Sequence, residues 1–282
     1  MSAPRGGMAA DFAAASRESL TALRSRLDET SQNASGDDLA TVGTSLEEVA
    51  DLLARETVLT RTLADSSADV TARESLSRNL FDSRVDRRTA EIVTAASSST
   101  WSRPEDLVEA LRTLAREALL VAAESEGRLD AVEDELFRLG RIVSAQPDLE
   151  RLLADPGADT EGKKQVLDRL IADRTEPTTR RLAAQLVAHP TGHGIAAGFE
   201  RLAELAAQRR ERSVATVRSS VALSDAQSER LASVLARIYH REITVHLEVD
   251  PELLGGLVIQ VGDEVIDGSV SGRLDDLARR LG

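Results

Sequence analysis

The chain has 282 residues, of which 41% are hydrophobic, and its 48 acidic against 35 basic residues give a formal net charge of −13. This length and apolar content allow one large folded domain or two ordinary ones, and the charge disfavours binding to nucleic acids or anionic lipids. Cysteine is absent and the aromatic residues are four Phe, one Trp and one Tyr, so thiolate chemistry, disulfides and aromatic-lined ligand pockets are excluded or disfavoured.

The N-terminal residues do not resemble a targeting or membrane segment. Residues 1–7 (MSAPRGG) carry a charge but no apolar stretch follows them. The longest glycine-free apolar run, residues 118–123, is far shorter than the about 20 residues of a membrane-spanning helix. We therefore expect a soluble cytoplasmic protein without direct membrane insertion, which leaves open its attachment to a membrane complex through a partner.

From about residue 9 to residue 212 the apolar residues recur at helical spacing. Leu20, Leu23 and Leu27 share one face, and residues 129–143 repeat the i, i+3, i+4, i+7 pattern of an amphipathic helix. Capping residues, proline or glycine interrupt the pattern, which predicts loops at 33–38, 97–104, 156–157 and 189–198.

The helical region contains an internal repeat. Residues 63–69 (LADSSAD) recur as residues 153–159 (LADPGAD), with five of seven identities at an offset of 90 residues. Further pairs keep this offset: Leu46 with Leu136, Leu59 with Leu149, Arg61 with Arg151, Leu80 with Leu170, Arg84 with Arg174 and Thr89 with Thr179. Chance agreement between two similar amphipathic segments is the alternative, but the ungapped run favours duplication. We predict tandem helical-bundle modules over 1–115 and 116–212, with a helix at about 105–126 closing the first and opening the second.

After residue 212 the period changes to that of a small α/β domain, residues 213–282. Strands are predicted at 213–218, 243–249, 256–261 and 264–267, with a turn at Gly262-Asp263. A helix at 224–240 begins with Ser224 as N-cap, and a last helix begins near Ser269. The predicted fold class is thus mainly α, with tandem helical bundles followed by this small α/β domain.

The histidines do not predict a metal site. His189 and His193 have the i, i+4 spacing of a helical ligand pair, but Pro190, Gly192 and Gly194 favour a loop. No third ligand lies near them in the sequence, so we expect no metal there. The remaining two histidines are His240 and His246.

The C-terminal acidic residues and glycines are likewise not predicted to form a catalytic or ligand-binding site. Asp263, Glu264 and Asp267 are either a cation site or solvated turn carboxylates, and the hairpin pattern favours the second reading. Glycines 255, 256, 262, 268 and 272 do not form a phosphate-binding motif, and no Gly-Lys-Ser/Thr occurs in the chain. We predict no catalytic, cofactor-binding or metal-binding residues.

Two short basic runs and the tryptophan remain. Arg87-Arg88 and residues 209–212 (RRER) are expected to be solvated helix ends, with contact to acidic partner helices as the alternative. Trp101 lies in the polar join between the repeats and is expected to pack that join.

Residues 250–274 (DPELLGGLVIQVGDEVIDGSVSGRL) resemble the C-terminal signature of the delta subunit of bacterial F-type ATP synthases, the oligomycin-sensitivity-conferring protein family. Residues 127–132 (GRLDAV), 147–155 (PDLERLLAD) and Lys163-Lys164 resemble its N-terminal helical domain, so the likeness covers 116–282. Residues 116–120 (REALL) lack the aromatic of the family's usual first helix. The additional first 115 residues resemble the extended delta subunits of actinobacteria.

The resemblance implies a non-catalytic stator subunit with no cofactor. By that resemblance the helical domain binds N-terminal segments of the alpha subunits on the catalytic head, and the C-terminal domain binds the end of the b-subunit stalk. The location implied is the cytoplasmic face of the cell membrane, through the complex. The first candidates for the contact with the b subunit are the 224–240 helix and the last helix, with Leu274, Leu277 and Leu281. For both helices, however, burial in the core of this domain is the favoured interpretation of the apolar residues.

Two alternatives from other classes remain open. One is a helical-repeat regulatory scaffold that shares only the C-terminal fold. The other is a hydrolase that uses Asp263, Glu264 or His246.

Overall fold

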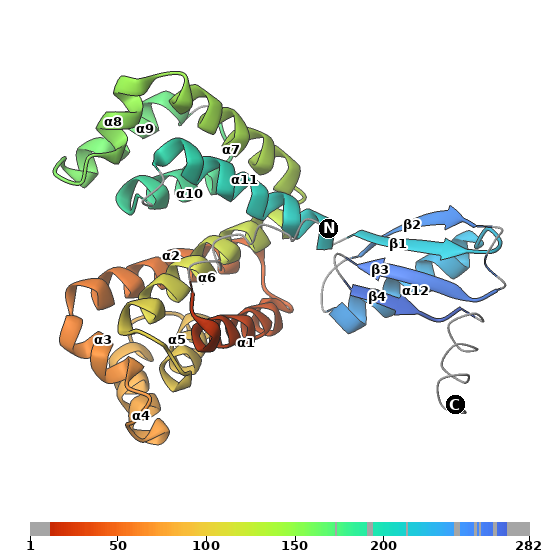
Figure 1. Cartoon of the computed structure of the whole chain (residues 1–282), viewed down its shortest axis with the longest axis horizontal. Helices are drawn as coiled ribbons and strands as arrows, with labels where there is room; N and C mark the ends of the chain where they lie inside the picture. The colour runs from red at the N-terminus through yellow and green to blue at the C-terminus, as the bar shows by residue number, and fades with distance from the viewer. Residues whose placement is uncertain are drawn as a thin grey trace. The chain divides into compact units, whose positions relative to one another are not determined.

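The computed structural model describes residues 12–172, 174–190, 194–212, 214–239, 243–250, 253, 255–261 and 264–269 (Figure 1). The chain divides into two compact units, Met1–Ala206 and Ala207–Gly282. The predicted division into 1–115, 116–212 and 213–282 is finer than this, because it separates the helical region into two parts.

The first unit is helical, as the sequence predicts. Its helices are α1 (Ala14–Ser31), α2 (Gly36–Arg55), α3 (Thr57–Ala64), α4 (Val70–Phe81), α5 (Arg87–Ser98), α6 (Pro104–Ser125), α7 (Leu129–Ser144), α8 (Pro147–Ala154), α9 (Thr160–Ile171), α10 (Pro177–Ala188) and α11 (Ile195–Arg212), which continues beyond Ala206.

A break is present in each of the four predicted regions, but 33–38 and 97–104 are too long as predicted, because α2 already begins at Gly36 and α5 ends only at Ser98. Ser35 caps α2 in a reciprocal capping box with Asp38, and Pro104 is the first residue of α6. The break predicted for residues 189–198 is too long, because α11 already begins at Ile195 and includes Gly198. There the missing side chain gives room to α10, since a Cβ on Gly198 would lie 2.4 Å from Leu186 Cδ1.

The internal repeat is visible in the helices. Helices α3, α4 and α5 begin and end 90 residues before α8, α9 and α10, and α1 begins 90 residues before α6. The caps repeat as well, because Asp69 accepts a hydrogen bond from the Ala72 N–H and Asp159 accepts one from the Gly162 N–H. We call α1–α6 the first module and α6–α11 the second module, with α6 common to both.

Buried cations occupy equivalent places in the two modules. Arg73 Nη1 on α4 donates to the carbonyls of Leu63, Ser97 and Ser99, and Lys163 Nζ on α9 donates to the Asp155 carbonyl. Arg73 and Lys163 are 3% and 4% exposed and lie 90 residues apart. Each cation satisfies carbonyl groups in and after neighbouring helices that would otherwise lack a partner.

The apolar side chains of the first unit form two clusters that meet along α6. The first cluster takes residues 107–118 of α6 together with side chains from α1, α2 and α5, such as Leu20, Leu46 and Ile92. The second takes residues 119–123 with side chains from α7, α10 and α11, such as Leu136, Leu182 and Phe199. Most residues of α6 are therefore buried, including the charged Asp106 and Arg116.

Among its described residues, the second unit consists of a four-stranded sheet and one helix that packs against it. Its elements are β1 (Val214–Ser219), α12 (Asp225–Tyr239), β2 (Thr244–Val249), β3 (Leu257–Val261) and β4 (Glu264–Asp267). The strand order is β2-β1-β3-β4, with β1 parallel to β2 and antiparallel to β3, and β3 antiparallel to β4. The small core consists of Ala215, Val217, Leu235, Ile243 and Val261.

The predicted C-terminal elements are confirmed where they are described. Ser224 forms a capping box with Gln227 at the start of α12. Gly256 has φ +85°, and a Cβ there would lie 2.4 Å from the Gly268 carbonyl oxygen, so this position requires glycine. The predicted Gly262-Asp263 turn, Leu274, Leu277, Leu281 and Gly272 lie outside the described residues.

The close approach of α2 to α6 gives a stability prediction. A Cβ on Gly43 would lie 2.8 Å from Leu119 Cγ and 2.9 Å from the Ala115 carbonyl oxygen. Gly43→Ala should therefore lower the free energy of unfolding by about 1–3 kcal/mol, despite the better helix propensity of alanine. Chemical denaturation measures it. Gly140→Ala is the matched control, because its Cβ would meet neighbours only at 3.3 Å, and an equal or larger loss there would contradict the prediction.

Candidate functional site

A groove of about 650 Å³ opens in the first unit beside the shared helix. Leu53, Thr60 and Arg61 of α2 and α3 line one part of it, and Val108 and Arg112 of α6 line another. His189 and Pro190, which follow α10, close the groove from the second module. The groove thus brings together residues from both modules.

Three potential ligand groups meet at His189, which is one of the residues that line this groove. His189 Nε2 lies 2.7 Å from Asp51 Oδ1 and 3.5 Å from Glu47 Oε1. Glu47 and Asp51 are one turn apart on α2, and His189 is the C-cap of α10. Glu47 is the most deeply buried of the three, with a side chain 12% exposed against 27% for His189 and 34% for Asp51.

Two arginines of α6 balance part of this acidic charge. Arg112 Nη2 lies 3.2 Å from Asp51 Oδ1, and Arg116 Nη1 lies 3.7 Å from Glu109 Oε1. Burial raises the pKa of Glu47 to about 7, even though Arg116 and Arg112 act in the opposite direction. Burial also lowers the pKa of His189, and the positive charge of Arg112 lowers it further, so its neutral form is favoured.

The predicted loop at His189 is confirmed, but its surroundings were missed. The sequence offers no third ligand near His189, whereas the fold places Glu47 and Asp51 of the other module beside it. The only signal available was the Glu47/Asp51 i, i+4 pair on one helix, which is too common to single out. His193 and His240 lie outside the described residues.

The C-terminal acidic residues that are described have local partners. Glu264 Oε2 accepts a hydrogen bond from the Tyr239 hydroxyl at 2.9 Å, and Asp267 accepts one from the Ser269 N–H at 2.8 Å. Hydrogen bonds from Ser269 lower the pKa of Asp267. His246 is exposed on β2 and Glu264 is on β4, which are the opposite edges of the sheet, so the structure does not bring this hydrolase pair together. Asp263 lies outside the described residues.

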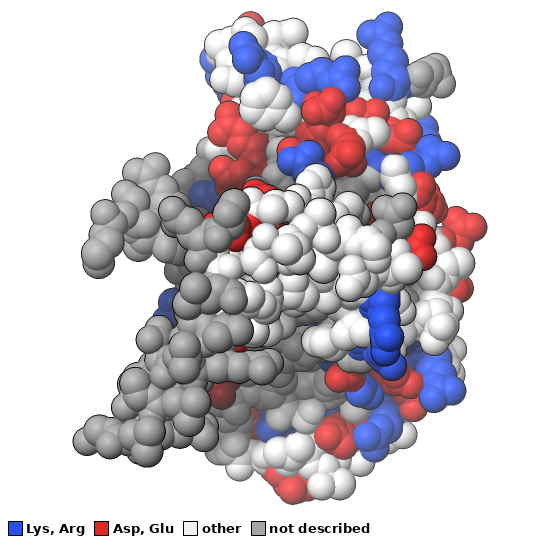
Figure 2. Space-filling model, turned by 90° about the vertical axis from the view of Figure 1, so that its right-hand side faces the viewer, with Lys and Arg blue, Asp and Glu red and all other residues white. Residues whose placement is uncertain are grey.

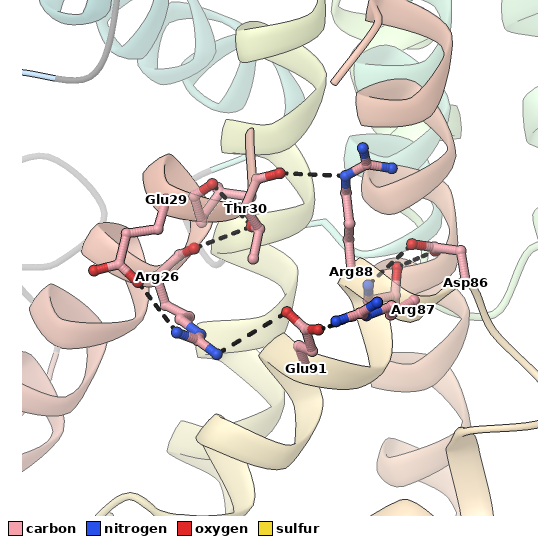
Figure 3. A network of polar contacts seen from close by, with 9 residues as sticks. Arg26, Glu29, Thr30, Asp86, Arg87, Arg88 and Glu91 are labelled. Carbon is pink, nitrogen blue, oxygen red and sulfur yellow. Dashed lines mark hydrogen bonds and ion pairs between the residues drawn. The ribbon is translucent and has the colours of Figure 1, made fainter. Parts of the chain in front are cut away.

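The Arg87-Arg88 run divides into one solvated and one structural residue (Figure 3). Arg87 is almost fully exposed and pairs with Glu91 on the next turn of α5, and Glu91 also faces Arg26 of α1. Arg88 instead donates from Nε to the Thr30 carbonyl at 3.2 Å, at the C-terminal end of α1. Arg88 therefore ties α5 to the negative end of the α1 dipole.

Trp101 and the basic run at residues 209–212 lie where the sequence predicts them. Trp101 is 5% exposed and donates from Nε1 to the Ala96 carbonyl at 2.9 Å, which confirms that it packs the join before α6. Arg209 and Arg210 lie near the C-terminal end of α11, in agreement with a helix end. Contact of either basic run with an acidic partner helix stays a prediction.

Several large apolar side chains are exposed. In the second module they are Phe137, Ile142, Leu152 and Leu170, which are 52%, 49%, 45% and 50% exposed. In the second unit they are Val221, Ile238, Val249, Val265 and Ile266. Core was the favoured interpretation of the 224–240 helix, and this is wrong for Ile238, which is 55% exposed, whereas Leu231, Leu235 and Tyr239 of α12 do pack in or against the small core.

Charges of both signs lie next to each other on the surface. Figure 2 shows that Asp/Glu and Lys/Arg side chains are interspersed on the face that it displays. Among the described residues, none of the helices combines the length and the apolar composition that a membrane span requires.

The two neighbouring arginines of α5 give a paired prediction. Arg88→Ala should lower the free energy of unfolding by about 1 kcal/mol, because the Thr30 carbonyl loses a charged donor. Arg87→Ala should leave it almost unchanged, because exposed i, i+4 ion pairs contribute little. Urea denaturation of both variants measures the difference, and equal effects would contradict the roles assigned here.

Glu47 gives a pH prediction for the metal-free chain in EDTA-containing buffer. The folded chain keeps a proton that the unfolded chain releases, because folding raises the pKa of this carboxyl from its ordinary value of 4.5 to about 7. Raising the pH through this window should therefore remove stability, on the order of 3 kcal/mol. Glu47→Gln should abolish most of this decline.

Denaturation curves at several pH values from 5 to 8 are the measurement. His189 contributes in the opposite direction, because its lowered pKa removes stability as the pH falls below 6.5, and this contribution stays in both proteins. Glu48→Gln, at the exposed next position of α2, is the matched control and should keep the wild-type decline. An unchanged slope in Glu47→Gln would refute the assignment.

The chain matches known proteins over nearly its whole length. The sequence model of the ATP synthase delta (OSCP) subunit family matches residues 115–281. ATP synthase subunit delta of Streptomyces coelicolor is 45% identical over 95% of this chain and 97% of its own length. The Nocardia farcinica subunit delta is 45% identical over 95% of this chain and 99% of its own.

Among solved structures, a chain of the Toxoplasma gondii mitochondrial ATP synthase hexamer is 19% identical and covers 59% of this chain and 94% of its own, with a TM-score of 0.31. That likeness is too low to bear on the fold. The actinobacterial relatives extend over the first module as well as residues 115–281, which confirms the extended form. The chain belongs to the ATP synthase delta (OSCP) subunit family and is a non-catalytic component of the peripheral stalk of an F-type ATP synthase.

Proposed function

We propose that the chain links the catalytic head of the ATP synthase to its stalk, with residues 116–212 binding N-terminal segments of the alpha subunits. The observation that carries this proposal is the exposure of Phe137 and Ile142 on α7, and of Leu152 and Leu170 on the next two helices. Large apolar side chains that stay in water are typical of surfaces that a partner covers. Burying each under an amphipathic partner helix would contribute about 1.5–3 kcal/mol.

The C-terminal unit is proposed to bind the end of the b subunit. Its core is small, and Ile238, Val265 and Ile266 remain exposed on α12 and β4. A domain of this size gains stability when a partner covers such side chains. We further propose that the chain is held at the cytoplasmic face of the cell membrane through the complex.

The proposed division of labour follows three parts, 1–115, 116–212 and 213–282. The change of apolar cluster between Ala118 and Leu119 supports the first boundary. The absence of a catalytic, cofactor or nucleic-acid role is also part of the proposal. It is supported by the local partners of Glu264 and Asp267, and by the mixed surface charge.

Replacing Phe137 tests the alpha contact. Phe137→Asp should weaken binding to catalytic heads stripped of their own delta subunit by at least about tenfold, since one buried apolar side chain is replaced by a charge. Native mass spectrometry measures the fraction of heads that carry one copy of the chain. Val58→Asp is the matched control, because Val58 is exposed on α3 of the first module.

The binding experiment has three possible outcomes. Loss in Phe137→Asp with retention in Val58→Asp supports the proposal. Equal binding by the wild type and both variants would place the head contact elsewhere. No complex with the wild type, although heads and chain are folded, would refute the proposed head contact.

A further inference from the structure

The polar cluster at the groove contains a buried carboxylate without hydrogen bonds. Glu47 is 9% exposed as a residue, and neither of its carboxylate oxygens has a hydrogen-bond partner among the described residues. His189 Nε2 has Asp51 Oδ1 as its polar partner at 2.7 Å, whereas Glu47 Oε1 lies 3.5 Å away from it. Buried polar atoms of this kind normally have a partner, so the cluster is incomplete as it stands.

The geometry points to a metal ion as that partner: we propose that Glu47, Asp51 and His189 form a site for a divalent transition metal of the Zn²⁺ class. The three ligand atoms all lie within 4.8 Å of one another. Tetrahedral ligands at about 2.0–2.1 Å from zinc are about 3.3 Å apart. The separation of 3.5 Å from His189 Nε2 to Glu47 Oε1 is close to this value, and the 2.7 Å separation to Asp51 needs only a small opening.

The ligand chemistry selects the metal class. One imidazole and two carboxylates suit zinc and its first-row neighbours better than Ca²⁺ or Mg²⁺, which take oxygen ligands almost only. The side chains of Asp51 and His189 are partly exposed, so an ion can reach them from solvent and keep a water as its fourth ligand.

The surrounding charge permits a cation despite two nearby arginines. The charged groups facing Glu47 are Asp51 from α2 and Glu109, Arg112 and Arg116 from α6, besides His189 after α10. With neutral His189 and ionised Glu47, three carboxylates face two guanidinium groups, which leaves one negative charge. Binding of a metal ion would therefore release the proton that the Glu47 carboxyl keeps in the metal-free chain. The C-terminal end of α10 adds a further negative dipole beside His189.

Metal binding would connect the two modules directly. Glu47 and Asp51 belong to α2 of the first module, whereas His189 belongs to the second. The ion would therefore fix the α10 end against α2. This role is separate from the proposed contacts with the alpha and b subunits.

The test is zinc titration of the full chain after EDTA treatment, followed by isothermal calorimetry. We expect saturable binding of one Zn²⁺ per chain and a higher unfolding temperature with the ion, because the folded state binds it better. Glu47→Gln and His189→Gln should each weaken binding by at least about tenfold, since even outer-shell changes have effects of this size. His246→Gln and Glu48→Gln, at exposed positions, are the matched controls and should bind like the wild type.

Cobalt substitution gives a readout that does not depend on stability. Co²⁺ in the site should show the visible absorption of a four-coordinate ion, and the circular dichroism of each variant shows whether its helices remain folded. Absorption that disappears in folded His189→Gln but persists in His246→Gln supports the site. No saturable binding by the wild type, or unchanged binding in His189→Gln, would overturn it and leave the cluster as an ion-pair joint.

Discussion

The helical unit depends on the burial of α6 by two apolar clusters at once. Residues 107–118 complete one cluster and residues 119–123 complete the other, without a break in the helix. The modules therefore cannot separate without exposing apolar surface of a helix that is nearly all buried. Arg116, 2% exposed on this helix, requires nearby carboxylates, and Glu109 and Glu47 are among them. The shared helix thus explains both the rigid join and the polar cluster beside it.

The repeat shows where the modules have diverged. Glu47 and Phe137 occupy the same position 90 residues apart, yet Glu47 is buried against the arginines of α6 and His189, whereas Phe137 is half exposed. In the first module this position is used to contact the second, and in the second module it remains uncovered. The same position therefore contributes to the contact between the modules in the first module. In the second module it belongs to the surface that is proposed to bind the head.

Sequence periodicity predicted the helices, the offset of 90 residues and most strands, because these depend on local propensity and apolar spacing. It did not identify which apolar residues are covered. Ile142 shares its predicted face with Leu139 and Val143 but is 49% exposed, because α7 buries a narrower stripe than the spacing suggests. The sequence could not predict that His189 meets Asp51, because this contact depends on how α2 and α10 each pack against α6 and not on any local pattern.

The order of the helices along the chain explains why the contact between the modules lies beside α6. Because α6 ends one module and begins the next, residues of α2 and of the α10 end approach it from different modules. Leu39 and Ala40 of α2 already belong to the second apolar cluster, so α2 crosses the boundary with α6. Bending between the modules would have to separate this apolar contact and the polar cluster together. In a component of a peripheral stalk, a boundary that is stabilised by both an apolar and a polar contact favours the transmission of force through the chain over bending between the modules.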